Sequence, residues 1–145
     1  MGGQLVIGTA MIGLTVGVHV GGIFAIIGLL KRYMAAIKDR DPYRPIVAAR
    51  VITGVVICVF FLHTVEIWFW AVLYVLLKQF ESLERALYFS TVTFTALGYG
   101  DITLEARWQL LSSLEAANGV ILFGVSTAFV FGLLLKFLQA AGIVK

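Results

Sequence analysis

Charged residues are scarce in this chain, and their scarcity argues against a soluble fold. Of its 145 residues, 13% are Asp, Glu, Lys or Arg and 61% are hydrophobic. The mean hydropathy is +1.00. Soluble domains carry roughly a quarter charged residues and about half apolar residues. The composition therefore predicts an integral membrane protein.

Cysteine is almost absent as well. The one cysteine, Cys58, cannot form an intrachain disulfide, and a zinc site built from several cysteines is excluded. Because Cys58 lies inside an apolar run, we expect it to be a small buried hydrophobic side chain.

Several functional motifs are missing. The sequence has no glycine-rich phosphate-binding loop and no nucleophile motif, so we predict no enzyme, no catalytic residue and no cofactor. Apolar runs with arginine at every third position are also absent, which excludes a voltage sensor of the usual kind.

Long apolar runs are what the chain does have. A helix needs about 20 apolar residues to cross a hydrocarbon core. Three runs satisfy this length, at residues 5–30, 51–77 and 110–141. The first is too long for a signal-peptide core and has no basic flank, so we expect it to be retained as a span. We expect Trp68, Trp70 and Tyr74 to anchor the second run at the membrane interface.

Basic residues predict the orientation. Residues 31–50 carry six of them, namely Lys31, Arg32, Lys38, Arg40, Arg44 and Arg50, whereas residues 78–109 carry three. Because cytoplasmic connections are enriched in Lys and Arg, residues 31–50 should be cytoplasmic. The N-terminus is then outside and the C-terminus inside.

The stretch between the second and third runs is too short to span. Ser82 can cap a short helix over residues 82–95, with Glu84 in its first turn. A glycine-spaced segment, residues 96–101, follows it. Irregular backbone at membrane depth is tolerated only where protein buries it or it lines an aqueous path. The pattern therefore predicts a re-entrant helix and loop.

This stretch resembles the pore helix and selectivity filter of potassium channels. It reads Tyr88-Phe89-Ser90-Thr91-Val92-Thr93-Phe94-Thr95-Ala96-Leu97-Gly98-Tyr99-Gly100-Asp101. The resemblance covers roughly residues 51–140 and leaves the first span outside. It divides the chain into an N-terminal helix with its connection, 1–50, and a pore module, 51–145. It also implies an outer helix 51–77 and an inner helix 110–141. Together with the first run, the chain is expected to have an all-α membrane fold with three spans, a re-entrant pore helix and a filter loop.

The resemblance implies a role for each part of this segment. Potassium ions, the only metal expected, would bind backbone carbonyls of Ala96, Leu97, Gly98, Tyr99 and Gly100. Gly98 and Gly100 permit the positive φ angles that such a filter needs. Thr93, Thr95, Asp101 and Glu115 are expected to support the filter or its outer mouth. Residues 119–128 resemble a glycine-hinged inner helix, with Gly119 and Gly124 as gate or hinge.

Two positions depart from the family pattern. Ala96 stands where threonine is usual, and Leu97 replaces valine or isoleucine. Without the threonine hydroxyl the innermost ion site should be weaker. A weakly selective cation channel is therefore one alternative to a potassium channel, and a non-conducting regulatory or scaffold subunit is another.

One filter strand cannot enclose an ion, so the resemblance implies a homotetramer around a central pore. Its expected partners are membrane lipid and potassium ions, not nucleic acid. The expected location is the plasma membrane, as the inner membrane of a bacterial or archaeal cell.

Some residues in the first two spans stand outside this resemblance. Gly13, Gly17 and Gly21 recur every four residues, which is typical of a helix-packing face. His19, His63 and Glu66 are ionisable groups within spans, and His63 and Glu66 share a helix face. These three could form a metal or proton-sensing site, as in a membrane metalloprotein, or bond to one another.

Overall fold

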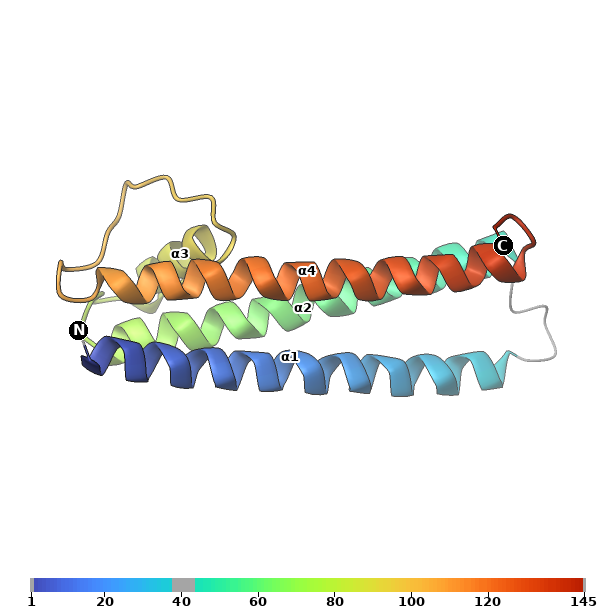
Figure 1. The fold of residues 1–145 in the computed structure, drawn as a ribbon, viewed down its shortest axis with the longest axis horizontal. Helices are drawn as coiled ribbons and strands as arrows, with labels where there is room; N and C mark the ends of the chain where they lie inside the picture. The colour runs from blue at the N-terminus through green and yellow to red at the C-terminus, as the bar shows by residue number, and fades with distance from the viewer. Residues whose placement is uncertain (1, 38–43, 145) are drawn as a thin grey trace.

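The computed structural model describes residues 2–37 and 44–144, and all regular structure in this part of the chain is helical. The helices are α1 (Gly2–Ala36), α2 (Pro45–Leu76), α3 (Leu83–Phe94) and α4 (Gln109–Ala140). The helices α1, α2 and α4 run alongside one another, and the short helix α3 packs at one end of this bundle (Figure 1). The predicted all-α fold, with three long helices and a short one before the last, is confirmed.

Each long helix can cross a membrane. Helices of 32 to 35 residues extend about 48–52 Å, more than the roughly 30 Å of a hydrocarbon core. Their outer surfaces are apolar, with large exposed side chains such as Phe24, Phe60, Leu76, Ile121 and Phe131. The chain is therefore a multi-pass membrane protein. Cys58 belongs to the same exposed surface, so the prediction that it is buried was wrong.

The ends of the chain lie on opposite sides of the bundle. The N-terminus lies at the end that carries α3 and the loop after it, and the C-terminus lies at the other end (Figure 1). Lys31, Arg32, Arg44 and Arg50 are close to the end away from α3. Lys38 and Arg40 lie outside the described residues. These four basic residues and the loop thus lie at opposite ends of the bundle, and the assignment of the basic end to the cytoplasm stays a prediction.

Two apolar clusters form the core, one at each end of the bundle. The cluster beside α3 contains Trp70, Tyr74, Phe89, Phe94, Leu104, Leu111 and Leu122, and the other contains Ile26, Val51, Val55, Val59 and Phe137. Trp70 and Tyr74 are fully buried, which contradicts their prediction as interfacial anchors. The reason is that α3 packs over this end of α2 and removes both rings from lipid.

The packing face of α1 also differs from the prediction. Gly13, Gly17 and Gly21 are exposed, and no atom of the neighbouring described residues lies within 4 Å of a Cβ placed at any of them. Close contacts are made instead by Gly8 against Leu114 and by Gly22 against Leu62. Within a single chain, α1 therefore packs on the pore module through a different pair of glycines.

Candidate functional site

The site begins with α3, whose start is fixed by a side-chain cap. The hydroxyl oxygen of Ser82 accepts a hydrogen bond from the backbone N–H of Arg85 at 3.3 Å, and Glu84 lies in the first turn. An acidic residue there is favourable, because the N-terminal end of a helix is electropositive. The helix buries an apolar face, including Phe89, against α2 and α4. A polar cap and one apolar face thus make the short helix that the sequence predicts.

The end of α3 is a Schellman motif with an unusual residue in it. The backbone N–H of Ala96 donates to the carbonyl of Thr93 at 2.9 Å, and that of Leu97 donates to the carbonyl of Val92 at 3.0 Å. Such a motif requires a left-handed residue, usually glycine. Here Ala96 occupies it with φ 56°. A residue with a Cβ in this conformation costs about 1–2 kcal/mol.

Left-handed backbone then recurs at every second residue. The φ angles are 56° at Ala96, 59° at Gly98 and 75° at Gly100. The two glycines adopt the positive φ that the sequence predicts, whereas Ala96 was not expected to. Tyr99 is 66% exposed, and residues 95–101 are all exposed in the single chain. The backbone of this segment is therefore accessible in the single chain and is not covered by a hydrophobic core.

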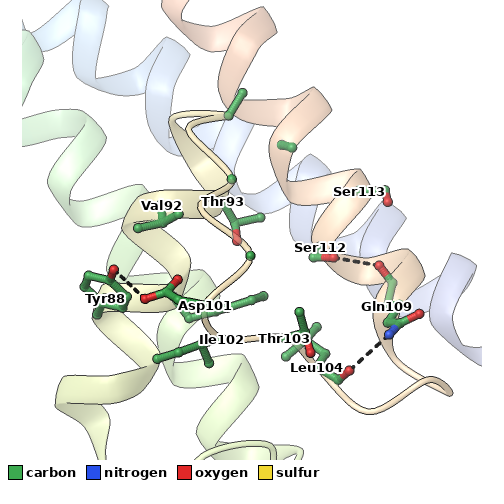
Figure 2. Close-up of a pocket in the computed structure, with 15 residues that line it drawn as sticks. Tyr88, Val92, Thr93, Asp101, Ile102, Thr103, Leu104, Gln109, Ser112 and Ser113 are labelled. Atoms are coloured by element: carbon green, nitrogen blue, oxygen red, sulfur yellow. Dashed lines mark hydrogen bonds between the residues drawn. The ribbon is translucent and has the colours of Figure 1, made fainter.

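A cavity of about 430 Å³ separates this segment from the bundle. It lies between the segment, α3 and the first turns of α4, and Thr93 and Ser112 line it (Figure 2). The loop is fixed across it by Tyr88, whose phenol donates to the Asp101 carboxylate at 2.8 Å. This bond raises the pKa of the Tyr88 phenol, because the neighbouring carboxylate disfavours its ionisation. Thr95 instead donates to the carbonyl of Thr91 at 2.8 Å, within its own helical turn.

Glu115 joins three helices behind this loop. It is fully buried in α4 and accepts a hydrogen bond from the phenol of Tyr74 on α2 at 2.7 Å. The hydroxyl of Ser90 on α3 also contacts the Glu115 carboxylate and lies 3.1 Å from the carbonyl of Ile67. The sequence indicates Glu115 as a brace but not its partners, because Tyr74 and Ser90 are 41 and 25 residues away.

Gly119 lies where α4 meets the end of α3. A Cβ at this position would be 2.0 Å from the carbonyl oxygen of Phe94. A Cβ at Gly124 would have no packing neighbour within 4 Å in the described part of the chain. The helix α4 continues through both positions. Gly119 is thus required for close packing, and a hinge at either glycine stays a prediction.

Three ionisable residues of the spans gather away from the loop. His19 of α1 and His63 of α2 both bond to Glu66 of α2, so these three side chains do bond to one another. Ser126 of α4 completes the group. Sequence analysis did not indicate Ser126, because a serine in a membrane helix carries no signal of its own.

Comparison with protein families identifies the region around the loop. A family described as "Ion channel" matches residues 60–136, which is more than half of the chain. The matched region begins within α2, includes α3 and the loop, and ends in α4, so α1 precedes it. No curated protein and no solved structure matches the chain.

Proposed function

This chain belongs to the ion channel family of the two-span, pore-loop type, and we propose that it forms a potassium-selective pore. The membership supports ion conduction in general. Potassium selectivity, the tetramer and the identity of the filter residues are our proposals.

The alternating backbone after α3 carries the proposal. A dehydrated cation needs several oxygen ligands, and backbone carbonyls can supply them without fixed charge. Left-handed residues at Ala96, Gly98 and Gly100 allow successive carbonyls to face one side of a strand. The C-terminal end of α3 stops directly before this strand, and its negative dipole favours a cation there.

The same segment supports a tetramer. Residues 95–101 are exposed in a single chain, so they have too few neighbours to enclose an ion. Four copies around one axis would supply a ring of carbonyls at each level and would cover the exposed Tyr99 ring. Conduction would be passive, down the electrochemical gradient. The orientation we propose places the loop outside and the basic connection in the cytoplasm of a bacterial or archaeal cell.

Ala96 supports weaker selectivity as a second candidate function. Its methyl group offers no hydroxyl to the innermost site, so water must complete the coordination shell of an ion there. A site finished by water discriminates less between Na⁺ and K⁺ than one built only from protein oxygens.

Ion flux from liposomes tests these proposals. Vesicles containing the purified full-length chain should lose K⁺ much faster than Na⁺, and Ba²⁺ should block the flux. The variant for comparison is Gly98→Ala, because a Cβ at φ 59° would add a second strained residue to the strand that already holds Ala96 at φ 56°, while within the described residues of a single chain the space around Gly98 is open. This variant should fold normally and lose flux.

Each alternative outcome is informative. Equal Na⁺ and K⁺ flux, lost in Gly98→Ala, would favour the weakly selective channel. No flux from a folded tetramer would refute conduction and favour a non-conducting subunit. Flux that survives Gly98→Ala would place the ion path somewhere other than this strand.

A further inference from the structure

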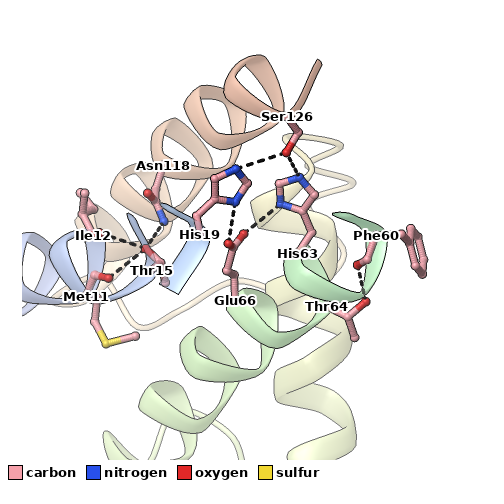
Figure 3. Close-up of polar contacts among 10 residues, drawn as sticks. All are labelled: Met11, Ile12, Thr15, His19, Phe60, His63, Thr64, Glu66, Asn118 and Ser126. Atoms are coloured by element: carbon pink, nitrogen blue, oxygen red, sulfur yellow. Dashed lines mark hydrogen bonds and ion pairs between the residues drawn. The ribbon is translucent and has the colours of Figure 1, made fainter. Parts of the chain in front are cut away.

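Four polar side chains form a closed ring halfway along the bundle. Glu66 accepts hydrogen bonds from Nδ1 of His19 at 2.8 Å and Nδ1 of His63 at 2.9 Å. Ser126 Oγ lies 2.9 Å from Nε2 of His63 and 3.3 Å from Nε2 of His19. The four residues come from α1, α2 and α4 (Figure 3). They lie away from the filter strand and have no part in the proposed conduction path.

The ring orients both histidines in the same way. Without an ion, each Nδ1–H is directed at an oxygen of the Glu66 carboxylate. When an ion takes the place of these hydrogens, each imidazole can carry its proton on Nε2 instead, and Ser126 can accept both Nε2–H groups because a hydroxyl oxygen has two lone pairs. Both Nδ1 lone pairs are then free to bind the ion. Metal-binding histidines characteristically donate their second ring N–H to such a fixed partner, which sets the tautomer and the ring orientation.

The spacing fits a small cation. The candidate ligand atoms of His19, His63 and Glu66 all lie within 4.8 Å of one another. Ligands of a tetrahedral zinc ion at about 2.0–2.1 Å are roughly 3.3 Å apart. Small side-chain rotations would therefore open the two short Nδ1–carboxylate contacts around an ion without moving the helices.

We propose that this ring is a transition-metal site that ties α1 to the pore module. His19 Nδ1, His63 Nδ1 and a Glu66 oxygen are the three protein ligands, and Ser126 orients the two imidazoles. A ligand set of two histidines and one carboxylate, with a fourth position left for water, is a known arrangement for zinc. Imidazole nitrogen favours zinc, copper and nickel over Mg²⁺ or Ca²⁺.

Burial strengthens the argument for a cation. The side chains of His19 and Glu66 are fully buried, and that of His63 is 8% exposed. A carboxylate at this depth in a membrane bundle is unfavourable unless a positive charge compensates it. A divalent ion supplies that charge and replaces the hydrogens that otherwise hold the ring together.

The site is coupled to the pore module through an aromatic contact. The His63 ring lies 4.5 Å from the ring of Phe123 and 6.1 Å from that of Phe94, measured between centroids. Phe94 is the last residue of α3 and precedes Ala96 by two positions. A metal that fixes His63 therefore also restrains the end of the pore helix.

Metal binding can be tested without any flux measurement. The full-length chain is purified in detergent with its affinity tag removed, stripped with chelator, and loaded with Zn²⁺ or Co²⁺. We expect one Zn²⁺ per chain by elemental analysis, a visible absorption band of tetrahedral Co²⁺, and a thermal midpoint that rises with zinc concentration.

Variants locate the bound ion. His19→Gln and His63→Gln should each weaken zinc binding at least 100-fold, and Ser126→Ala should weaken it 10- to 100-fold. The matched control is Thr15→Val, which removes a buried hydroxyl of α1 that bonds to Asn118. This hydroxyl lies outside the ring, so the control should bind zinc as the wild type does.

Two results would overturn the proposal. One is a folded wild-type protein that binds no zinc and gives no Co²⁺ band, which would leave the ring as a hydrogen-bonded clamp only. The other is zinc binding that survives both histidine substitutions, which would place the metal elsewhere. Where the histidine variants fail to fold, the Co²⁺ spectrum of the wild type still decides between nitrogen–oxygen coordination and none.

Discussion

A methyl group at position 119 should push the pore helix α3 away from α4. The Cβ of Gly119→Ala would lie 2.0 Å from the carbonyl oxygen of Phe94 and 2.9 Å from its carbonyl carbon. A carbon and an oxygen rarely approach closer than about 3.3 Å, so the two backbones must separate by roughly 1.3 Å. The obstacle is backbone and cannot rotate aside as the end of a flexible side chain can.

The size of the effect follows from this clash. Overpacking in a filled core costs about 1–3 kcal/mol. A loss near 2 kcal/mol should lower the thermal midpoint by roughly 5 °C in a chain of this length. Because Phe94 is two residues before Ala96, the same displacement should reduce flux through the filter.

Gly124→Ala is the matched control, since position 124 lies on the same helix with open space around it. It should be neutral, or stabilise α4 by up to about 1 kcal/mol through helix propensity. The folded fraction after heating is measured by size exclusion, and flux is measured in liposomes. An unchanged midpoint in Gly119→Ala would refute the packing argument. Equal losses of flux in both variants, with unchanged stability, would favour a hinge.

Substitutions at three further positions test the loop and its supports. Ala96→Gly should raise the thermal midpoint, because it relieves about 1 kcal/mol of left-handed strain. Ala96→Thr should lower it, because β-branched residues tolerate positive φ poorly; the reverse order would disprove the strain. Glu115→Gln should destabilise the folded chain by about 2 kcal/mol, since an amide replaces the acceptor of two buried hydroxyls, and an unaltered unfolding midpoint would rule out the brace. The wild type should be more stable than Tyr88→Phe, and this difference in unfolding free energy should be full below about pH 10, the ordinary tyrosine pKa. It should be lost as pH rises through the raised pKa of the Tyr88 phenol. If the difference in unfolding free energy stays constant up to about pH 11, the bond to Asp101 contributes nothing.

The sequence predicts those parts of the fold that are determined by residues close together in the chain. Run lengths gave the three spans, and Ser82 gave the start of the short helix through its cap. Positive φ was expected at Gly98 and Gly100 because glycine adopts it freely. The same reasoning did not indicate Ala96, because its conformation follows from the end of α3 and not from its own preference.

Contacts between distant segments could not be predicted. Lipid accepts any apolar face, so regular spacing at Gly13, Gly17 and Gly21 does not show which side of α1 meets the bundle. Trp70 resembles an interfacial residue in the sequence, but it packs in one cluster with Phe89 and Phe94 of α3. His63 and Glu66 share a helix turn and could be paired from sequence, but His19 is 47 residues from Glu66. Only the packing of three helices brings these side chains together.

The polar ring has a consequence for how the chain can be divided. The pore module alone, without α1, would leave the Glu66 carboxylate facing hydrocarbon with one of its two histidine donors missing. Removing one partner of a buried charged group is strongly destabilising, by about 3–5 kcal/mol. The helix α1 is therefore a structural part of the bundle. A shortened protein that starts at α2 should be too unstable to serve as a minimal channel.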